Sequence, residues 1–374
     1  MYIKIPILFI IIIFSKYGFN NEGYEEMQEF VDLALKGILI DQNQTLLYPE
    51  NPLISIIIAI YNGEGYIKNG LFSIKNQDLK DIEIIIVDDC SKDNSSQLID
   101  EFMKYDPRIR FFKNKERKGT LFTKSRGVLN SKGKYVLIFD QDDMYVKRYA
   151  LSTLYDEIEK NKLDILGFTS IETNSFHIYS KTYKHIFRNK RETDIIYQPD
   201  IRKNMYLHTK TNKIKRRNAV IWNYIIKSDL FIKCINEIDN KIMNTIMVRH
   251  EDYLIFFLLS RNAYNLKYIK KVFYAQIILK KSKNKKIIFS IEQKNNNKKD
   301  LECMSFINYA EFLLMKTDDT VLDKKIASFE LDRWVLRKCK NNEYIKERRK
   351  DVFTLFINNK YIENKMKKKL LSLI

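Results

Sequence analysis

Three aspartates stand at the end of an apolar run in this sequence. The segment "GKYVLIFDQDD" (Gly133–Asp143) passes from strand-like residues directly into Asp140, Asp142 and Asp143. At an effective dielectric constant near 20, two unit charges about 4 Å apart repel each other by roughly 4 kcal/mol. The carboxylates are therefore either solvated in a turn or placed to hold a cation. Mg²⁺ and Mn²⁺ prefer such oxygen ligands, commonly one or two carboxylates together with substrate phosphates.

The elements that must position these aspartates form a regular series. Apolar, β-branched runs recur at intervals of about 26 residues and are typical of strands buried on both faces of a parallel sheet; they span residues 53–60, 82–87, 108–113 and 135–139. Segments with helical spacing lie between them, one of them with Ser91 or Asp93 as a candidate N-cap. The pattern predicts right-handed βαβ units and a Rossmann-like α/β fold.

Polar and aromatic residues follow three of these runs. Tyr61 comes directly after the first run, Asp89 after the second and the three aspartates after the fourth. In open α/β sheets, ligands bind beyond the carboxyl ends of the strands, so we expect these residues to meet at one edge. The sequence has no GxGxxG or P-loop motif. The three strand ends together favour a metal-assisted nucleotide-diphosphate site over a plain acidic turn that caps a helix.

Composition excludes several other classes of protein. The chain of 374 residues has 66 Lys and Arg against 47 Asp and Glu, a formal net charge of +19. The lysines are scattered rather than gathered on one stripe, so no nucleic-acid partner is expected. The four histidines show no HExxH spacing and the four cysteines no CxxC pair, which argues against a zinc site and gives no clear disulfide framework.

Five segments, in this order, carry a resemblance to a known family. They are "PLISIIIAIYNGEGYI", "IEIIIVDDCSKDNS", "KGTLFTKSRGVLNSKGKYVLIFDQDD", "IWNYIIKSDLF" and "RHEDYLIFFLLSRNAYNLKYIKKVFY". Together they cover about residues 52–275 and resemble the family 2 glycosyltransferases. The resemblance implies a GT-A fold with a mostly parallel central sheet. It also implies transfer of a sugar, with inversion, from a nucleoside diphosphate sugar such as a UDP-sugar to an acceptor hydroxyl, assisted by Mn²⁺ or Mg²⁺.

The resemblance also implies roles for residues of the first half. Asp142 looks like the principal metal ligand, with Asp143 nearby. The nucleotide sugar would be bound by Ala59 and Tyr61 beside the base, Glu64 near the base or ribose, Asp89 at the base edge, Arg126, and Asp140 near the ribose. Cys90 stands where the family commonly has glycine, and Gly127 follows Arg126 where the family usually has asparagine.

The second half should supply the general base. Asp252, preceded by Glu251, resembles the family's Glu-Asp motif at the start of a helix and would take the proton from the acceptor hydroxyl. Alternatively, the two acids have no catalytic role and occupy the first turn of the helix only because the helix dipole favours negative charge there. Trp222, Asn223 and Glu251 are candidates for an acceptor or sugar pocket. An exposed Trp can stack on a pyranose ring, although most Trp residues are core.

The same reasoning divides the chain into four parts. Residues 1–18 contain an apolar stretch that suits a signal peptide or short membrane anchor, residues 19–51 a stem or linker helix, and residues 276–374 a basic helical extension. Residues 52–275 form the catalytic domain, with a nucleotide-binding half at 52–145 and an acceptor half at 146–275. We expect a protein of the secretory pathway (endoplasmic reticulum or Golgi) or one associated with a membrane. The sequons at Asn43 and Asn94 leave the side of the membrane open.

Two other functions compete with this interpretation. A nucleotidyltransferase would also use a Rossmann-like sheet with an acidic metal site, but would need a glycine-rich, basic first loop. A catalytically inactive protein that binds membranes or nucleic acid would use only the positive charge. The acceptor, whether glycan, lipid or protein, is not specified by these residues.

Overall fold

The computed structural model describes residues 21–41, 45–173, 186–188, 192–206, 220–247 and 251–277, with scattered positions between 303 and 372. The predicted signal peptide or anchor at 1–18 lies outside the described residues. Within the described ranges, no helix has the length and apolar character needed to cross a bilayer.

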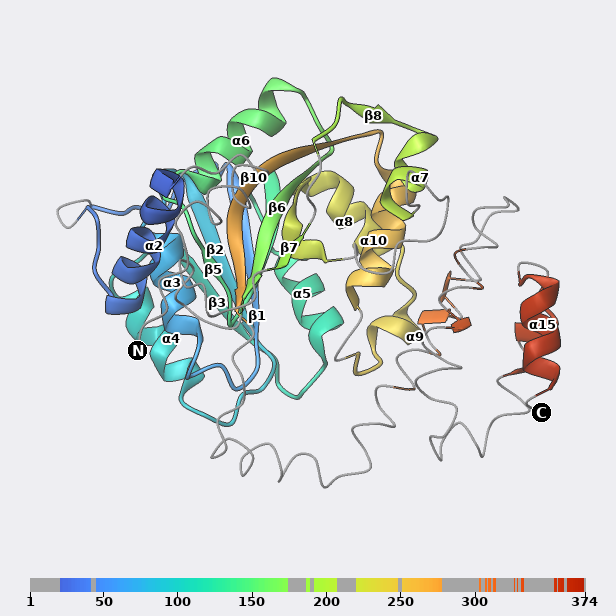
Figure 1. The fold of residues 1–374 in the computed structure, drawn as a ribbon. Coiled ribbons are helices and arrows are strands. Elements are labelled where there is room, and N and C mark those ends of the chain that lie inside the picture. The colour runs from blue at the N-terminus through green and yellow to red at the C-terminus, as the bar shows by residue number, and fades with distance from the viewer. Residues whose placement is uncertain are drawn as a thin grey trace, which may run out of the picture.

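One mixed sheet forms the centre of the molecule (Figure 1). Its order is β3-β2-β1-β4-β9-β6-β10-β5, with β7 beside β6 and β8 beside β10. The strands are β1 (Ile54–Ile60), β2 (Ile82–Asp88), β3 (Ile109–Lys113), β4 (Tyr135–Asp140), β5 (Met144–Tyr145), β6 (Ile165–Thr173), β7 (Ile186–Arg188), β8 (Ile196–Tyr197), β9 (Tyr224–Lys227) and β10 (Asn265–Ile277). Strands β3, β2, β1 and β4 are parallel, as are β6 and β10, while β9 runs antiparallel to both of its neighbours. The predicted Rossmann-like α/β fold with a mostly parallel sheet is confirmed.

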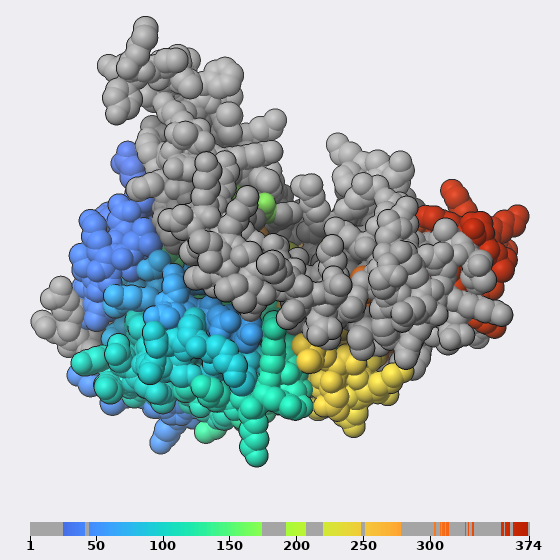
Figure 2. All heavy atoms as spheres, turned by 90° about the horizontal axis from the view of Figure 1, so that it is seen from below, coloured from blue at the N-terminus to red at the C-terminus, as the bar shows by residue number. Residues whose placement is uncertain are grey.

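Helices cover both faces of this sheet. The first face carries α3 (Ile67–Lys75), α4 (Ser95–Met103) and α6 (Ala150–Lys160), and the second carries α5 (Thr120–Leu129), α8 (Ser228–Asn236) and α10 (Glu251–Asn262). Side chains alternate along a strand, so Ile56 and Ile58 pack with the first group and Ile57 with the second. Shorter elements complete the fold: α7 (Asp200–Tyr206), the 3₁₀ turn η1 (Ile221–Asn223), α9 (Asn240–Met243) and α15 (Asn364–Leu371). In the space-filling view, the surface of the first half adjoins the yellow surface of the second (Figure 2).

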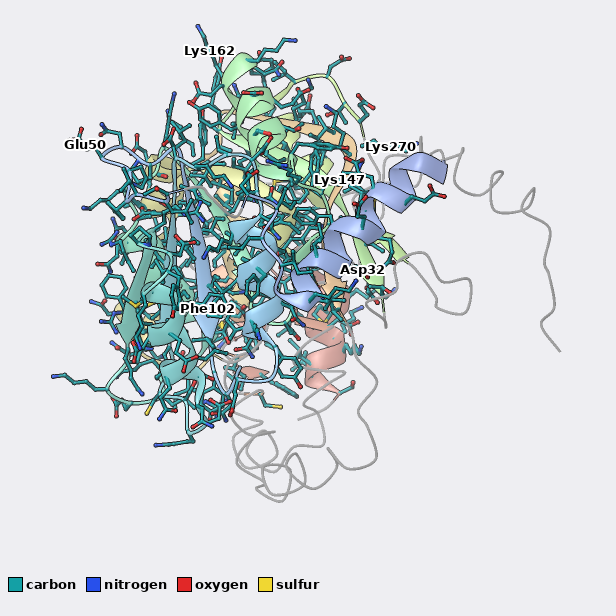
Figure 3. The ribbon with its side chains drawn as sticks, turned by 90° about the vertical axis from the view of Figure 1, so that its left-hand side faces the viewer. Asp32, Glu50, Phe102, Lys147, Lys162 and Lys270 are labelled. Atoms are coloured by element: carbon teal, nitrogen blue, oxygen red, sulfur yellow. The ribbon has the colours of Figure 1, made fainter. Side chains whose placement is uncertain are left out.

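The predicted stem helix belongs to the folded body. Helix α2 (Asn21–Lys36) buries Met27, Val31 and Ala34 against residues of β5, β6 and β10. Figure 3 shows α2 across this side of the molecule, with the labelled Lys147 beside it, and Lys147 Nζ lies 3.7 Å from Glu26 Oε2. The helix was predicted correctly, but its assignment to a linker separate from the domain was wrong, because its apolar face finds a partner on the sheet.

The described part of the C-terminal extension is also packed. Phe312, Phe353 and Leu370 are buried in the same hydrophobic cluster as α8 and α10. Cys303 is disulfide-bonded, which the wide spacing of the cysteines had not revealed.

A buried carboxylate fastens the end of the sheet where β1 and β2 begin. The Glu83 side chain, fully buried, accepts hydrogen bonds from Ser55 Oγ (2.6 Å), Tyr48 Oη (3.0 Å) and the backbone N–H of Lys132 (2.5 Å), and it pairs with Arg110 Nη1 at 2.7 Å. Burial alone would raise the pKa of Glu83, but these hydrogen bonds outweigh it and hold the pKa below its usual value. Glu83 therefore ties the segment before β1 to the turn before β4.

We expect Glu83→Gln to lower the free energy of unfolding by about 2–3 kcal/mol at pH 7, because it leaves Arg110 and several donors poorly paired. A depressed carboxyl pKa stabilises the fold above the pKa of the unfolded chain, so the difference from wild type should shrink as the pH falls below about 4. Urea titrations across this pH range measure both effects. The exposed Glu116→Gln is the control and should cost under about 1 kcal/mol; equal losses would contradict the role given to Glu83.

Candidate functional site

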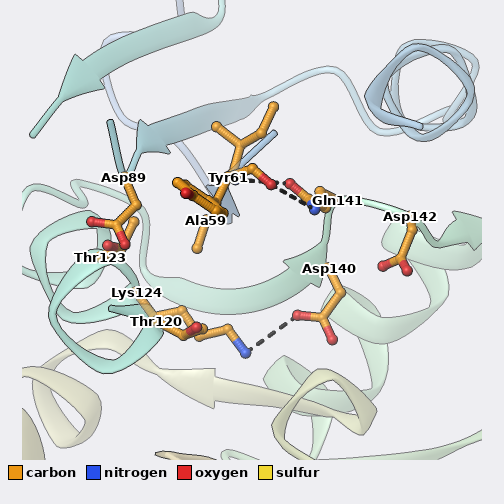
Figure 4. Close-up of a pocket in the computed structure, with 10 residues that line it drawn as sticks. Ala59, Tyr61, Asp89, Thr120, Thr123, Lys124, Asp140, Gln141 and Asp142 are labelled. Atoms are coloured by element: carbon orange, nitrogen blue, oxygen red, sulfur yellow. Dashed lines mark hydrogen bonds and ion pairs between the residues drawn. The ribbon is translucent and has the colours of Figure 1, made fainter. Parts of the chain in front are cut away.

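A pocket of about 190 Å³ opens at the carboxyl ends of β1, β2 and β4, at the edge that the sequence predicts (Figure 4). Five of the predicted residues line it: Ala59, Tyr61, Asp89, Asp140 and Asp142. Five others that line it were not predicted: Ile60, Thr120, Thr123, Lys124 and Gln141. The tertiary structure thus brings together most of the expected nucleotide-binding and metal residues.

Tyr61 is held in this pocket by Gln141. The Gln141 side chain accepts from Tyr61 N at 2.9 Å and donates to Tyr61 O at 3.3 Å, which joins the loop after β1 to the acidic turn after β4 (Figure 4). The guanidinium of Arg117 lies 4.1 Å from the centre of the Tyr61 ring. The backbone of Tyr61 is therefore fixed at the pocket by Gln141, and its ring makes a cation–π contact with Arg117.

Glu64 lies away from the pocket, contrary to its predicted contact with base or ribose. It is exposed and accepts from the backbone N and the Nδ2 of Asn94, at 3.2 and 2.9 Å. Asn62 N similarly donates to Ser91 Oγ at 2.9 Å. These contacts join the loops after β1 and β2, and Asn94 takes the N-cap position of α4 that Ser91 or Asp93 was expected to fill.

Asp89 is already engaged by its own chain. It is buried and accepts hydrogen bonds from Asn114 Nδ2, Lys118 N and Gly119 N, at 2.9, 2.7 and 2.8 Å. One of its oxygens takes two of these bonds and the other takes one, so a single acceptor position remains for a base edge. Next to it, Cys90 has a φ of 65°, in the left-handed region where glycine is favoured, in agreement with the glycine that the family resemblance leads one to expect there.

Arg126 does not reach the pocket, contrary to prediction. Its guanidinium donates to Lys113 O and Asn114 Oδ1, at 2.9 and 2.7 Å. Lys124, two residues earlier, faces the pocket instead, because residues two apart on a helix point about 200° apart. Arg126 is therefore linked to Asp89 only indirectly, because it donates to Asn114, which in turn donates to Asp89.

Lys124 is the centre of an ion-pair network that the sequence reasoning missed. Its side chain is only 4% exposed, and Nζ lies 3.2 Å from Asp140, 2.8 Å from Glu251 and 3.4 Å from Asp252. Burial alone would lower the pKa of Lys124, but the three carboxylates hold it well above its usual value. Leu121 and Val128 flank Lys124 at helical spacing on the buried face of α5; a lysine on such a face is the sequence pattern that could have identified it.

Asp252 and Glu251 begin α10, as predicted, and both approach this ammonium. Burial raises the pKa of Asp252 to about 7; Lys124 acts in the opposite direction, and Glu251 and Asp140 add to the increase. A carboxylate with a pKa near 7 is a stronger base than an ordinary aspartate and is still available at neutral pH.

The three aspartates of the acidic turn have different surroundings. Burial, followed by the charge of Asp140, raises the pKa of Asp142 to about 6. Asp143 is buried and bonded to Tyr274 Oη and the backbone of Ile277, so it faces the protein rather than the pocket. The described residues contain no group of three His, Cys, Asp or Glu suited to a metal ion. Asp140 and Asp142 still fit a cation that takes its remaining ligands from a diphosphate.

Trp222 and Asn223 are core residues, contrary to the acceptor-pocket prediction. The Trp222 side chain is 2% exposed and its ring stacks on that of Tyr274, with centroids 5.0 Å apart. Asn223 is fully buried in η1. Neither lines the pocket described above, because the 3₁₀ turn packs its side chains inward between the sheet and α10.

We expect Lys124→Met to lower the free energy of unfolding at pH 8 by about 3 kcal/mol, because it leaves buried carboxylates without a counter-charge. Adding Glu251→Gln should recover part of this loss. Lys203→Met, which breaks an exposed pair, is the matched control and should cost under about 1 kcal/mol. Chemical denaturation measures all three variants, and a Lys124 variant as stable as its control would refute the network.

Comparison with known sequences gives a family match over this same region. A model described as "Glycosyl transferase family 2" matches residues 55–221. Glycosyltransferase GlyG of Streptococcus pneumoniae is 37% identical over 114 residues, which are 30% of this chain and 38% of that protein. A Campylobacter jejuni GalNAc(5)-diNAcBac-PP-undecaprenol beta-1,3-glucosyltransferase is 34% identical over 122 residues, 32% of this chain and 39% of that protein. The chain therefore matches less than half the length of these relatives.

The fold has a solved counterpart. The crystal structure of S. aureus TarS 1-349 in complex with UDP superimposes with a TM-score of 0.57 and 16% sequence identity, covering 86% of each chain. At this identity the likeness concerns the fold alone. The family match covers nearly all of β1, the whole of β2 and β4, and the acidic turn (140–143) at the end of β4. Over residues 55–221, a little less than half of its length, the chain is similar to the glycosyltransferase 2 family.

Proposed function

We propose that this protein is an inverting glycosyltransferase that moves a sugar from a nucleoside diphosphate sugar to an acceptor hydroxyl, with Asp252 as the general base. One observation carries the proposal: a single buried ammonium, on Lys124, joins Asp140 of the nucleotide edge to Asp252 at the start of α10. The proposed base therefore lies next to a lysine that lines the proposed donor pocket, which the helix-dipole explanation for Asp252 does not require.

A UDP-sugar is the donor that we propose. The fold is that of TarS, for which structures with UDP and with UDP-GlcNAc exist. The nucleotide would lie along β1 and β2, with its base near the Tyr61 ring and the remaining acceptor position of Asp89. Its diphosphate would lie toward Lys124, Asp140 and Asp142, which line the same pocket.

The proposed reaction is a single displacement. Asp252 takes the proton of the acceptor hydroxyl while the acceptor oxygen forms a bond to the anomeric carbon of the donor. The bond from that carbon to the diphosphate oxygen breaks, and the nucleoside diphosphate leaves with the electron pair. Attack from the face opposite the leaving group inverts the anomeric centre.

Asp142, with Asp140, would hold a divalent cation. When bound, Mn²⁺ or Mg²⁺ neutralises charge that develops on the departing diphosphate. Burial, and after it the charge of the neighbouring aspartates, raises the pKa of both Asp142 and Asp143. The crowding of Asp140, Asp142 and Asp143 at one turn supports a cation there. Lys124 supplies a positive charge beside Asp140, with Nζ 3.2 Å from Oδ1.

The acceptor is proposed only as a class: a glycan, a lipid or a protein that offers a hydroxyl. For the location of the protein, we propose the secretory pathway or a membrane surface, as the N-terminal apolar stretch suggests. The disulfide at Cys303 supports an oxidising compartment. Protease protection of the full chain in microsomes, with detection of the disulfide by mass spectrometry under non-reducing conditions, tests this location.

Replacement of Asp142 tests the donor site. We expect Asp142→Asn to weaken Mn²⁺-dependent binding of UDP by at least about tenfold, since even outer partners of a metal ligand change affinity by that much. Isothermal titration with UDP, with and without Mn²⁺, measures it, and Asp229→Asn at the exposed start of α8 is the control. Tighter binding of a nucleoside triphosphate would favour a nucleotidyltransferase; no nucleotide binding would favour an inactive basic protein.

Replacement of Asp252 tests the base. Because the pKa of Asp252 is about 7, kcat/KM should rise with pH through this value and level off above it. Asp252→Asn should lower kcat by about 10³-fold and leave UDP affinity within twofold of wild type. UDP release from a panel of UDP-sugars measures the rate. Asp229→Asn, another acid in a helix first turn, should have no effect; a similar fall in both variants would contradict a specific role for Asp252.

A further inference from the structure

Tyr274, on β10, occupies the centre of a cluster of buried rings. Its ring contacts those of Phe139, Tyr145 and Trp222, with centroids 5.4, 5.7 and 5.0 Å away. The register of β10 against β6 shifts between Val272 and Tyr274. Such an irregularity re-aims side chains along a strand, which places Tyr274 where a regular strand would not.

The hydroxyl of Tyr274 fastens the acidic turn. It donates to Asp143 Oδ2 at 2.8 Å and accepts from the backbone N–H of Asp140 at 3.0 Å. The other oxygen of Asp143 accepts from Ile277 N at 3.0 Å. Both ends of the turn are thus fixed to β10, and Asp142 lies between them. The direction of the two carboxylates that line the pocket, Asp140 and Asp142, follows from these bonds.

The ring of Tyr274 supports the other half of the site. Trp222 stacks on it with an interplanar angle of 17°. The residue before Trp222 is Ile221, whose backbone hydrogen bond stabilises the charged form of Asp252. Tyr274 therefore connects the two parts of the proposed site: its hydroxyl contacts the acidic turn, and its ring contacts the segment that bonds to Asp252.

Fixation of this turn has a physical purpose. Asp140, Asp142 and Asp143 repel one another, so a free turn would spread its carboxylates and lose the arrangement that a cation needs. Hydrogen bonds from outside the ligand set are the usual means of holding ligating carboxylates in place. Asp143 faces inward and holds the turn through its bonds to Tyr274 and Ile277. This gives the third aspartate of the motif a structural role.

We propose that Tyr274 is a positioning residue: its hydroxyl, with Asp143, sets Asp140 and Asp142 for the donor diphosphate and its cation, and its ring sets residues 221–223 next to Asp252. This inference rests on the proposed function for the identity of the ligand, but the positioning itself is measurable without any ligand.

Tyr274→Phe removes the hydroxyl and keeps the ring. Tyr145→Phe is a matched control, because the Tyr145 hydroxyl is buried in the same cluster and has no hydrogen-bond partner in the described structure. We expect Tyr274→Phe to speed amide hydrogen exchange in peptides spanning residues 140–143 and to leave residues 221–223 unchanged. Trp222→Leu should instead speed exchange at residues 221–223 and leave residues 140–143 unchanged. Trp222→Phe, which keeps an aromatic ring, should show wild-type exchange at 221–223.

The ligand arm uses UDP and Mn²⁺ as probes with the full chain. Tyr274→Phe should raise the Mn²⁺ concentration that half-saturates UDP binding by about tenfold, whereas Tyr145→Phe should leave it within twofold. A general loss of packing would lower the melting temperature of both Tyr274→Phe and Tyr145→Phe, but it would not raise the required Mn²⁺ concentration in the first variant alone. If exchange at 140–143 in Tyr274→Phe equals that of the control, the positioning role is overturned. If exchange responds but wild type itself binds no UDP, the proposed function fails and the link of Tyr274 to a donor site fails with it.

Discussion

The arrangement of the site depends on one buried ammonium. Lys124 projects from α5 into a group of carboxylates that come from the end of β4 and the start of α10, and it lies within 3.4 Å of three of them. Without it, the buried Glu251 and the partly buried Asp252 would have no counter-charge, and the carboxylates at the end of β4 and the start of α10 would repel each other. The distribution of charge at this point decides which carboxylate can act as a base.

The remaining structure restricts motion around that ion-pair network. Gln141 joins the acidic turn to Tyr61, Asp89 holds the loop before α5, and Tyr274 joins the same turn to β10. Each contact links segments far apart in the chain, so the pocket is set by long-range hydrogen bonds rather than by any single loop. Site residues that must keep their orientation before a ligand arrives are commonly supported in this way.

Sequence reasoning identified the first four strands, the edge of the sheet and five of the ten residues that line the pocket, because apolar periodicity and strand-end position are local properties. It misplaced Glu64, Arg126, Trp222 and Asn223, whose side chains bond or pack elsewhere in the structure. Arg126 and Lys124 differ by two positions on one helix, and only the packing of α5 on the sheet shows which of them faces the pocket. Gln141 was missed because no periodic pattern distinguishes a glutamine with distant partners from a solvated one. Lys124 was missed although it lies on the apolar face of α5, because its carboxylate partners are more than ten residues away in the chain.

The sequence by itself determined the α/β class, the presence of the first four strands, the family resemblance and the places of Asp142 after β4 and Asp252 at the start of α10, since each depends on composition and spacing along the chain. The tertiary structure alone decided that α2 packs on the sheet, that Asp143 faces inward and that one lysine serves both halves of the site. The physical reason is that burial and pairing of charges are properties of the surroundings. A carboxylate has its ordinary pKa in the sequence, and only its neighbours in the fold give Asp252 a value near 7 and direct Asp143 to Tyr274.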